Sequence, residues 1–199
     1  AYDVSDTAAN VATAVAASVA GIEGASGTVT ATGNATVAHA DIIAAFTKAA
    51  VFSVSDTATN VAAASAAALN EAVNIVTTGT STLAQANTAI AASNSGTTTI
   101  AAVSGTSAEI VTLSIGANDT ITTLSVTGTT TGADAVTIAA KDTGTNVTNA
   151  IAFTNVTGTA AELTTVGATV LAAATGTITA SASTLAEYTA LAAAVTGAN

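Results

Sequence analysis

The chain has 199 residues, a formal net charge of −10, and only two basic side chains against twelve acidic ones. Two basic residues cannot neutralise a phosphate backbone or an anionic lipid surface, which argues against nucleic acid and membrane partners. Cys, Pro, Met and Trp are absent, which excludes disulfides and thiolate chemistry.

Alanine and threonine dominate the composition, with 54 Ala and 42 Thr. Half of the residues are hydrophobic and 7% are charged, the opposite of the pattern that keeps a chain disordered. The apolar runs are too short to span a membrane, so membrane insertion is not expected. We therefore expect a packed fold.

Repeated phrases predict a series of helix starts. The phrase SDTAANVA at residues 5–12 returns as SDTATNVA at 55–62, and TVAHA at 36–40 returns as TLAQA at 82–86 and TLAEY at 184–188. Each phrase places Asn, His, Gln or Glu three residues after a Thr, the spacing of a helix cap or capping box. The predicted starts, in chain order, are Thr7/Asn10, Thr36/His39, Thr57/Asn60, Thr82/Gln85, Thr106/Glu109, Thr143/Asn146, Thr159/Glu162 and Thr184/Glu187.

Short β-branched runs precede most of these starts and predict strands. They cover residues 28–30, 51–54, 74–76, 97–100, 151–153 and 177–179. After several starts, apolar residues recur at helical spacing, as at Val11, Val15 and Val19. The sequence thus predicts an α/β fold, a solenoid-like stack of strand–turn–helix coils of about two dozen residues each, with a parallel sheet on one face.

The long interval between Thr106 and Thr143 interrupts this pattern. Val111, Leu113 and Ile115 alternate with polar residues, and a turn-forming stretch at 116–119 precedes a second alternating run. We interpret this interval as a β-hairpin insertion. The predicted organisation is one repeat domain over 1–199, with regular repeats at 1–108, a β-rich insertion at 109–141 and further repeats at 142–199.

Residues suited to catalysis are scarce. His39 is the only histidine, and it occupies a position where other repeats carry Asn, Gln or Glu, so a role at a helix start explains it. No nucleophile-elbow pattern such as G-x-S-x-G occurs. An enzyme is not expected.

The carboxylates allow two interpretations. Calcium takes six to eight oxygen ligands, and acidic turns of repeat proteins provide them. Alternatively, an acidic residue near a helix N-terminus is favoured by the helix dipole. The candidate calcium ligands are Asp3, Asp6, Asp56, Asp119 and Asp142.

The repeated phrases and the Ala/Thr-rich, Cys-free, acidic composition resemble the repeats of large bacterial surface proteins. These are S-layer, adhesin and filament-forming proteins of the calcium-dependent, haemolysin-like (RTX) type. The stretch GANDTI at residues 116–121 is similar to the end of their calcium-binding nonapeptide. The resemblance implies a secreted, extracellular, structural role at the bacterial cell surface, with calcium as the implied cofactor.

The expected function is that of a self-assembling filament or surface-layer subunit whose partner is the chain itself. The end strands of a stack present unpaired edges, and this chain has few charges to block pairing there. Head-to-tail contacts that do not close would give a filament or array. Two alternatives stay open: an adhesin or spacer module that binds glycan or protein, and an ice-binding protein whose Thr-rich strands form ranks.

Overall fold

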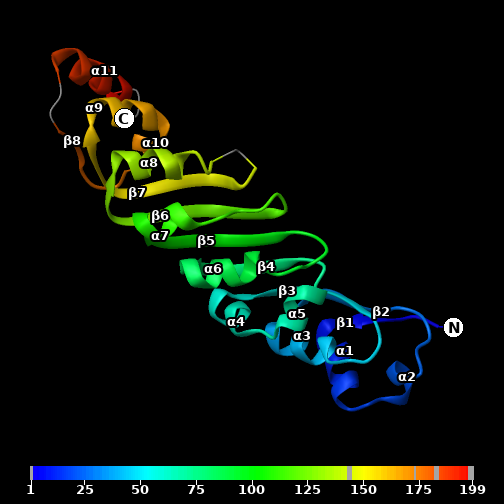
Figure 1. Cartoon of the computed structure of the whole chain (residues 1–199). Coiled ribbons are helices and arrows are strands. Elements are labelled where there is room, and N and C mark those ends of the chain that lie inside the picture. Colours follow the sequence, from blue (N-terminus) through cyan, green and yellow to red (C-terminus); the bar gives the residue numbers. More distant parts are fainter. Residues whose placement is uncertain (1, 143–144, 173, 182–183, 197–199) are drawn as a thin grey trace. The chain divides into compact units, whose positions relative to one another are not determined.

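The computed structural model describes residues 2–142, 145–172, 174–181 and 184–196 (Figure 1). The fold is mixed α/β with parallel strands, which confirms the predicted class. The chain divides into two compact parts, residues 1–101 (the N-terminal region) and residues 102–199 (the C-terminal region), and each is described by itself.

In the N-terminal region, the strands pair in parallel and in chain order. Val4 lies opposite Val29, Val54 opposite Ile75, and the Ile75 N–H donates to the Thr97 carbonyl. Strand β1 is at the edge of this open sheet. The strands are β1 (Val4–Thr7), β2 (Val29–Ala35), β3 (Ala50–Thr57), β4 (Ile75–Ser81) and β5 (Thr98–Thr106), which continues into the next region.

Short helices follow these strands, and most start at a Thr cap. The hydroxyls of Thr7, Thr36, Thr57 and Thr82 each accept the N–H three residues ahead, as predicted. Helix α1 packs against α3, α3 against α5, and α4 against α6 (Figure 1). The helices are α1 (Ala8–Ala16), α2 (Ala20–Glu23), α3 (Val37–Ala44), α4 (Ala58–Ala63), α5 (Ala66–Glu71) and α6 (Leu83–Ile90).

The core lies between these helices and one face of the sheet. Alternate strand residues such as Val29, Phe52 and Ile75 are fully buried, as period-2 strand geometry requires. Alanines such as Ala40 and Ala86 are buried on the facing helices. Small side chains on the helices therefore meet large ones on the strands.

The C-terminal region repeats this arrangement. Leu124 lies opposite Ile151 and Val156 opposite Ile178, again in parallel, and strand β8 is at the edge. The elements are α7 (Ser107–Thr112), β6 (Asp119–Thr131), α8 (Gly132–Ala139), β7 (Val147–Thr159), α9 (Ala160–Val166), α10 (Ala168–Ala172), β8 (Ile178–Ser181) and α11 (Leu185–Thr196).

The predicted β-hairpin at residues 109–141 is wrong. Residues 107–112 form helix α7, and β6 pairs in parallel with β7 instead of turning back on its own chain. The alternation of Val111 and Leu113 arises where α7 ends, with Leu113 as its extended C-cap residue.

The predicted helix start at Thr143 is also corrected. Thr143 lies outside the described residues, but Asn146 directly precedes strand β7, so no helix follows it. The helix of this segment starts earlier, at Thr131, whose hydroxyl accepts the Asp134 N–H. Sequence reasoning missed this start because it considered only Asn, His, Gln or Glu three residues after Thr, whereas Asp134 occupies that position here.

Two kinds of strand alternate along the chain. The glycine strands β2, β4 and β6 contain Gly33, Gly79 or Gly128 with φ of 72°, 73° or 76°, a left-handed conformation that favours glycine. The strand register shifts at this site in β2 and β6. The valine strands β1, β3, β5 and β7 lack this glycine and end in Val, then Ser or Thr, then Asp or Gly, then the capping Thr.

Replacing Gly79 with Ala should lower the free energy of unfolding by roughly 1–2 kcal/mol, because the left-handed backbone is strained for a residue with a Cβ. The space around Gly79 is open, so the cost is conformational and not steric. Gly21→Ala is the matched control, because Gly21 lies in open space on helix α2 without a positive φ. Urea denaturation should show the loss for Gly79→Ala alone.

Candidate functional site

The carboxylate of Asp56 connects one strand–helix segment to the preceding one. Its Oδ1 accepts the Thr57 N–H and the Asn60 side-chain amide, both at 2.8 Å. Its Oδ2 accepts the N–H of Val37, the first residue of α3, at 2.9 Å. Burial acts to raise the pKa of Asp56, but the hydrogen bonds from Val37, Asn60 and Thr57 outweigh it and hold the pKa below its usual value.

Asp6 is the equivalent residue of strand β1. Its Oδ1 accepts the Asn10 side-chain amide at 2.8 Å and the Thr7 N–H at 2.7 Å, and these two bonds lower its pKa. Its Oδ2 has no hydrogen-bond partner among the described residues. The contact that Asp56 makes with a neighbouring helix is therefore missing at Asp6.

In β5 and β7, glycine replaces this aspartate, and a glutamate from the helix takes over the cap. Glu109 accepts the Thr106 N–H and Glu162 accepts the Thr159 N–H, both at 2.8 Å, in complete capping boxes. A Cβ on Gly158 would lie 2.9 Å from Glu162 Oε2, so the glycine leaves room for the glutamate. The chain thus uses either Asp-Thr-x-x-Asn or Gly-Thr-x-x-Glu at these starts.

The other predicted calcium ligands also have roles in the fold. Asp3 accepts the Thr28 N–H at 2.7 Å, and Asp119 accepts the Gly116 N–H at 2.8 Å in its own turn. The backbone N–H of Asp142 donates to the Ala139 carbonyl at the end of α8.

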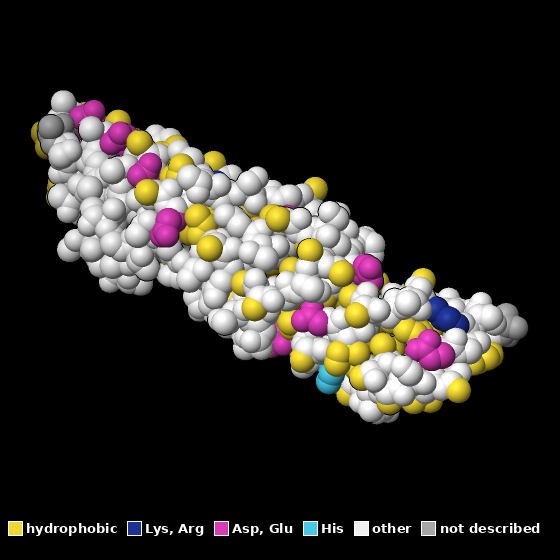
Figure 2. Space-filling model, turned by 60° about the horizontal axis from the view of Figure 1, so that its bottom comes forward, with side chains coloured by type: hydrophobic (Ala, Val, Ile, Leu, Met, Phe, Trp, Pro, Cys, Tyr) yellow, Lys and Arg dark blue, Asp and Glu magenta, His cyan; other side chains and the backbone are white. Residues whose placement is uncertain are grey.

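The structure does not bring these five aspartates together. Among the described residues, no three His, Asp or Glu side chains form a group that could hold a metal ion. Figure 2 shows the acidic side chains of the visible face as separate groups on a largely uncharged surface. The carboxylate contacts that the structure does show are those of caps and turns.

His39 and the two lysines also make hydrogen bonds within the chain. The His39 N–H donates to the Thr36 hydroxyl at 3.4 Å, and its side chain is partly buried. The Lys48 ammonium donates to the carbonyls of Glu23 and Ala25, and the Lys141 ammonium to the Leu113 carbonyl at 2.6 Å. Burial lowers the pKa of Lys141. Each lysine follows a helix, α3 or α8, and its ammonium group binds backbone carbonyls at or just beyond the end of an earlier helix, α2 or α7.

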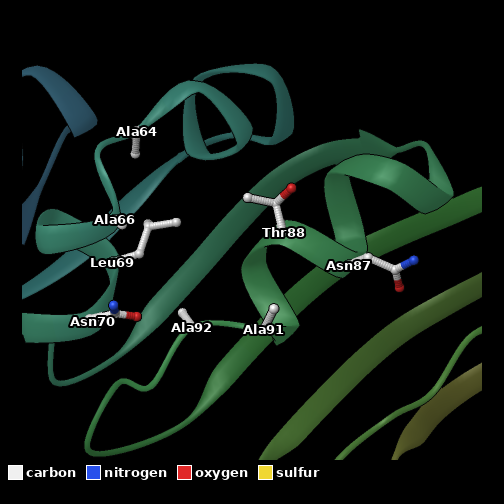
Figure 3. A pocket seen from close by; sticks show the side chains of 8 residues that line it. All are labelled: Ala64, Ala66, Leu69, Asn70, Asn87, Thr88, Ala91 and Ala92. Atoms are coloured by element: carbon white, nitrogen blue, oxygen red, sulfur yellow. The ribbon is translucent and has the colours of Figure 1, made fainter.

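A groove of about 510 Å³ lies between α5 and α6 (Figure 3). Figure 3 shows Leu69 reaching into it from α5, opposite Ala91 and Ala92 beyond the end of α6. Its polar lining consists of the neutral side chains Asn70, Asn87 and Thr88. This lining contains no titratable group, so the groove offers shape and hydrogen bonds but no acid–base chemistry.

Apolar side chains are exposed beside edge strand β1. Tyr2 is 48% and Val19 is 47% exposed, and Val4 is half-buried although the equivalent Val54, Val103 and Val156 are buried. With Asn10 and Ile22 these residues line a groove of about 300 Å³ on β1 and α1, which also includes Asp6. We call this surface the α1 groove.

Apolar side chains are also exposed on the last helix. Leu185 and Tyr188, the first and fourth residues of α11, are 81% and 61% exposed. The fourth residue is almost completely buried in every earlier helix that follows a Thr cap: Val11, Ala40, Val61, Ala86, Ile110, Ala135 and Leu163. We call the surface of Leu185 and Tyr188 the α11 surface. Sequence reasoning missed the α1 groove and the α11 surface. The exposure of a side chain there depends on whether a neighbouring segment covers it, and the residue type alone does not show this.

Comparison with known proteins gives no match to a family model, a curated protein or a solved structure. Among the described helices, none combines the length and the apolar character that a membrane crossing requires.

The Asp-Thr-x-x-Asn cap should be convertible to a Gly-Thr-x-x-Glu cap only when both residues of the pair, Asp and Asn, are replaced together. Asp56→Gly should lower the free energy of unfolding by about 1–2 kcal/mol, because the acceptor for the Thr57 and Val37 N–H groups is lost. Adding Asn60→Glu should recover part of this loss by creating the Gly-Thr-x-x-Glu box. Asn60→Glu alone should give no such gain, since its carboxylate would face Asp56. Additive effects in this double-mutant cycle would contradict the pairing.

Stability should fall as the pH drops below about 5. Hydrogen bonds lower the folded-state pKa of Asp6, Asp56, Glu109 and Glu187. The unfolded chain, with ordinary carboxyl pKa values of about 4, therefore binds protons first, and the stabilisation is lost as the pH falls towards the folded values.

Circular dichroism melting curves from pH 7 to pH 3 test this prediction. A constant Tm over that range would contradict it. Glu109→Gln keeps an acceptor at the cap, as Gln85 does in α6, but removes one titrating group. Its Tm should decline less steeply with falling pH.

Proposed function

We propose that the chain is an extracellular structural protein that assembles with copies of itself, as a filament or surface-layer subunit of a bacterial cell surface. The observation that carries this proposal is the exposure of apolar side chains at the α1 groove and the α11 surface, at positions that are buried elsewhere in the chain. Exposed apolar patches bounded by polar residues are typical of protein interaction sites.

The proposal includes a solenoid-like stack of strand–turn–helix coils. With Thr131 in place of Thr143, the interval from Thr106 is 25 residues and the next interval, to Thr159, is 28. Both are close to the 25 residues between Thr57 and Thr82. In such a stack each coil buries its apolar face on the next, so an uncovered end coil favours association.

Edge strands support the same conclusion. Among the described strands, β1 and β8 each have a neighbour on one side only, which leaves backbone groups for pairing with another chain. Charged side chains usually block such edges, but this chain has only 7% charged residues. The Ala/Thr-rich composition and the resemblance to S-layer and RTX-type repeats agree with an exposed structural role.

The observed side-chain contacts do not favour the ice-binding alternative. Regular rows of Thr across the strands would be needed in both regions. The C-terminal region has one such row, at residues 131, 157 and 179. In the N-terminal region, however, Thr30 lies between Ser5 and Val51 in the sheet register. The Thr97 and Thr177 hydroxyls donate to Asn74 and Asn155 at 3.1 Å. An adhesin that binds glycans by stacking would need more aromatic side chains than the two Tyr and three Phe of this chain.

Electron microscopy and sedimentation of the purified chain test the proposal. Ordered filaments or sheets are expected with calcium and also after chelation, because the observed contacts of Asp3, Asp6, Asp56 and Asp119 are those of caps and turns. Loss of order on chelation would make some of these aspartates metal ligands. Monomers under both conditions at high protein concentration would overturn the proposed function.

A further inference from the structure

Resting on the proposed self-assembly, we propose that copies bind head to tail, with the α11 surface of one copy in the α1 groove of a second copy. In this interface the Asp6 carboxylate accepts the backbone N–H of Leu185 from the other copy. The occupant of the α1 groove is thus a second copy of this chain.

Asp6 and Asp56 occupy equivalent positions in their segments. Both follow Val-Ser, precede the capping Thr, and bind an Asn side chain through Oδ1. The second oxygen of Asp56 accepts the first N–H of α3, whereas the second oxygen of Asp6 has no such partner among the described residues. Asp6 can therefore accept the first N–H of another helix placed as α3 is placed beside β3.

Leu185 and Val37 also occupy equivalent positions. Each is the first helical residue after a capping Thr, because Thr184 accepts the Glu187 N–H as Thr36 accepts that of His39. Val37, whose N–H binds Asp56, is 8% exposed, whereas Leu185 is 81% exposed. The Leu185 N–H has no acceptor among the described residues, as expected in the first turn of a helix.

Both the α11 surface and the α1 groove expose apolar side chains that can pack together. Tyr188 is one turn further along α11 than Leu185, so the two side chains lie on the same side of the helix. The α1 groove offers Val4, Val19 and Ile22 to these side chains and has a volume of about 300 Å³. Aromatic side chains that fill such grooves dominate many interfaces.

The order of the segment types along the chain also favours this head-to-tail contact. Valine strands and glycine strands alternate from β1 to β7, and an Asp of a valine strand contacts the helix of the preceding glycine strand, as Asp56 contacts α3. The start of α11, TLAEY, matches the start of α6, TLAQA, which follows glycine strand β4. The segment that should follow α11 is of the valine type, and β1 of a second copy is of that type.

Two single variants separate a head-to-tail interface from other modes. Val19→Lys places a charge in the α1 groove and leaves the α11 surface intact, whereas Tyr188→Lys does the reverse. Both side chains are exposed, so neither change should prevent folding. Val51→Lys is the matched control, because it adds the same charge at a position on β3 that is 42% exposed and outside both surfaces.

Sedimentation of each variant alone and of their equimolar mixture is the decisive measurement. In the head-to-tail arrangement each variant alone is monomeric, the mixture forms a one-to-one dimer, and Val51→Lys assembles like the wild type. Dimers of either variant alone, or a mixture that stays monomeric while the wild type assembles, would overturn this interface but not the proposed function. A monomeric wild type would overturn both.

The Asp6 contact has its own test in the mixture. Asp6→Ala introduced into the Tyr188→Lys partner, which supplies the α1 groove, should weaken the dimer about tenfold or more, because a charged acceptor for the Leu185 N–H is lost. Asp56→Ala is the matched control, since it removes an equivalent cap inside the fold and should lower Tm without changing the dimer affinity. Equal dimer affinities with and without the Asp6→Ala change would remove this contact from the interface.

Discussion

The backbone N–H groups at the start of each short helix impose the main constraint on this fold. A helix of six to nine residues, such as α4 or α1, has nearly as many unpaired terminal N–H groups as internal hydrogen bonds. The chain meets this need with a Thr hydroxyl for one N–H and a carboxylate or amide oxygen for the Thr N–H. Helix starts and turns therefore account for most of its few charged side chains.

This constraint also explains which parts of the fold the sequence could predict. The Thr-x-x-Glu and Thr-x-x-Gln starts at Thr82, Thr106, Thr159 and Thr184 were predicted correctly because their side chains and spacing are specific. The start at Thr131 was missed because Asp was not among the residue types expected three positions after Thr, and Asp134 stands there. The hairpin was predicted wrongly because Val111, Leu113 and Ile115 alternate with polar residues, as in a strand. The same alternation arises where a short helix ends in an extended cap residue, so the pattern does not distinguish the two.

The candidate site was less predictable than the fold. Asp3, Asp6, Asp56 and Asp119 could be selected from the sequence as oxygen donors, but only the folded structure shows that their oxygens accept backbone N–H groups. The α11 surface was hidden for another reason. In the sequence Leu185 is equivalent to Leu83 and Val37, and its exposure depends on the absence of a covering segment within the described chain.

One carboxylate at the Asp56 position both caps its own helix and accepts an N–H from the helix of the preceding segment. A repeat that couples local capping to contact between segments leaves two groups without a partner among the described residues: the second carboxylate oxygen of Asp6 on strand β1 and the N–H of Leu185 on α11. These two groups are complementary as hydrogen-bond acceptor and donor, and they lie beside exposed apolar side chains. Because the donor and the acceptor belong to different ends, two like ends cannot satisfy each other. The hydrogen bond from a helix N–H to the Asp of the next segment, as between Val37 and Asp56, therefore favours head-to-tail association through these surfaces over head-to-head association.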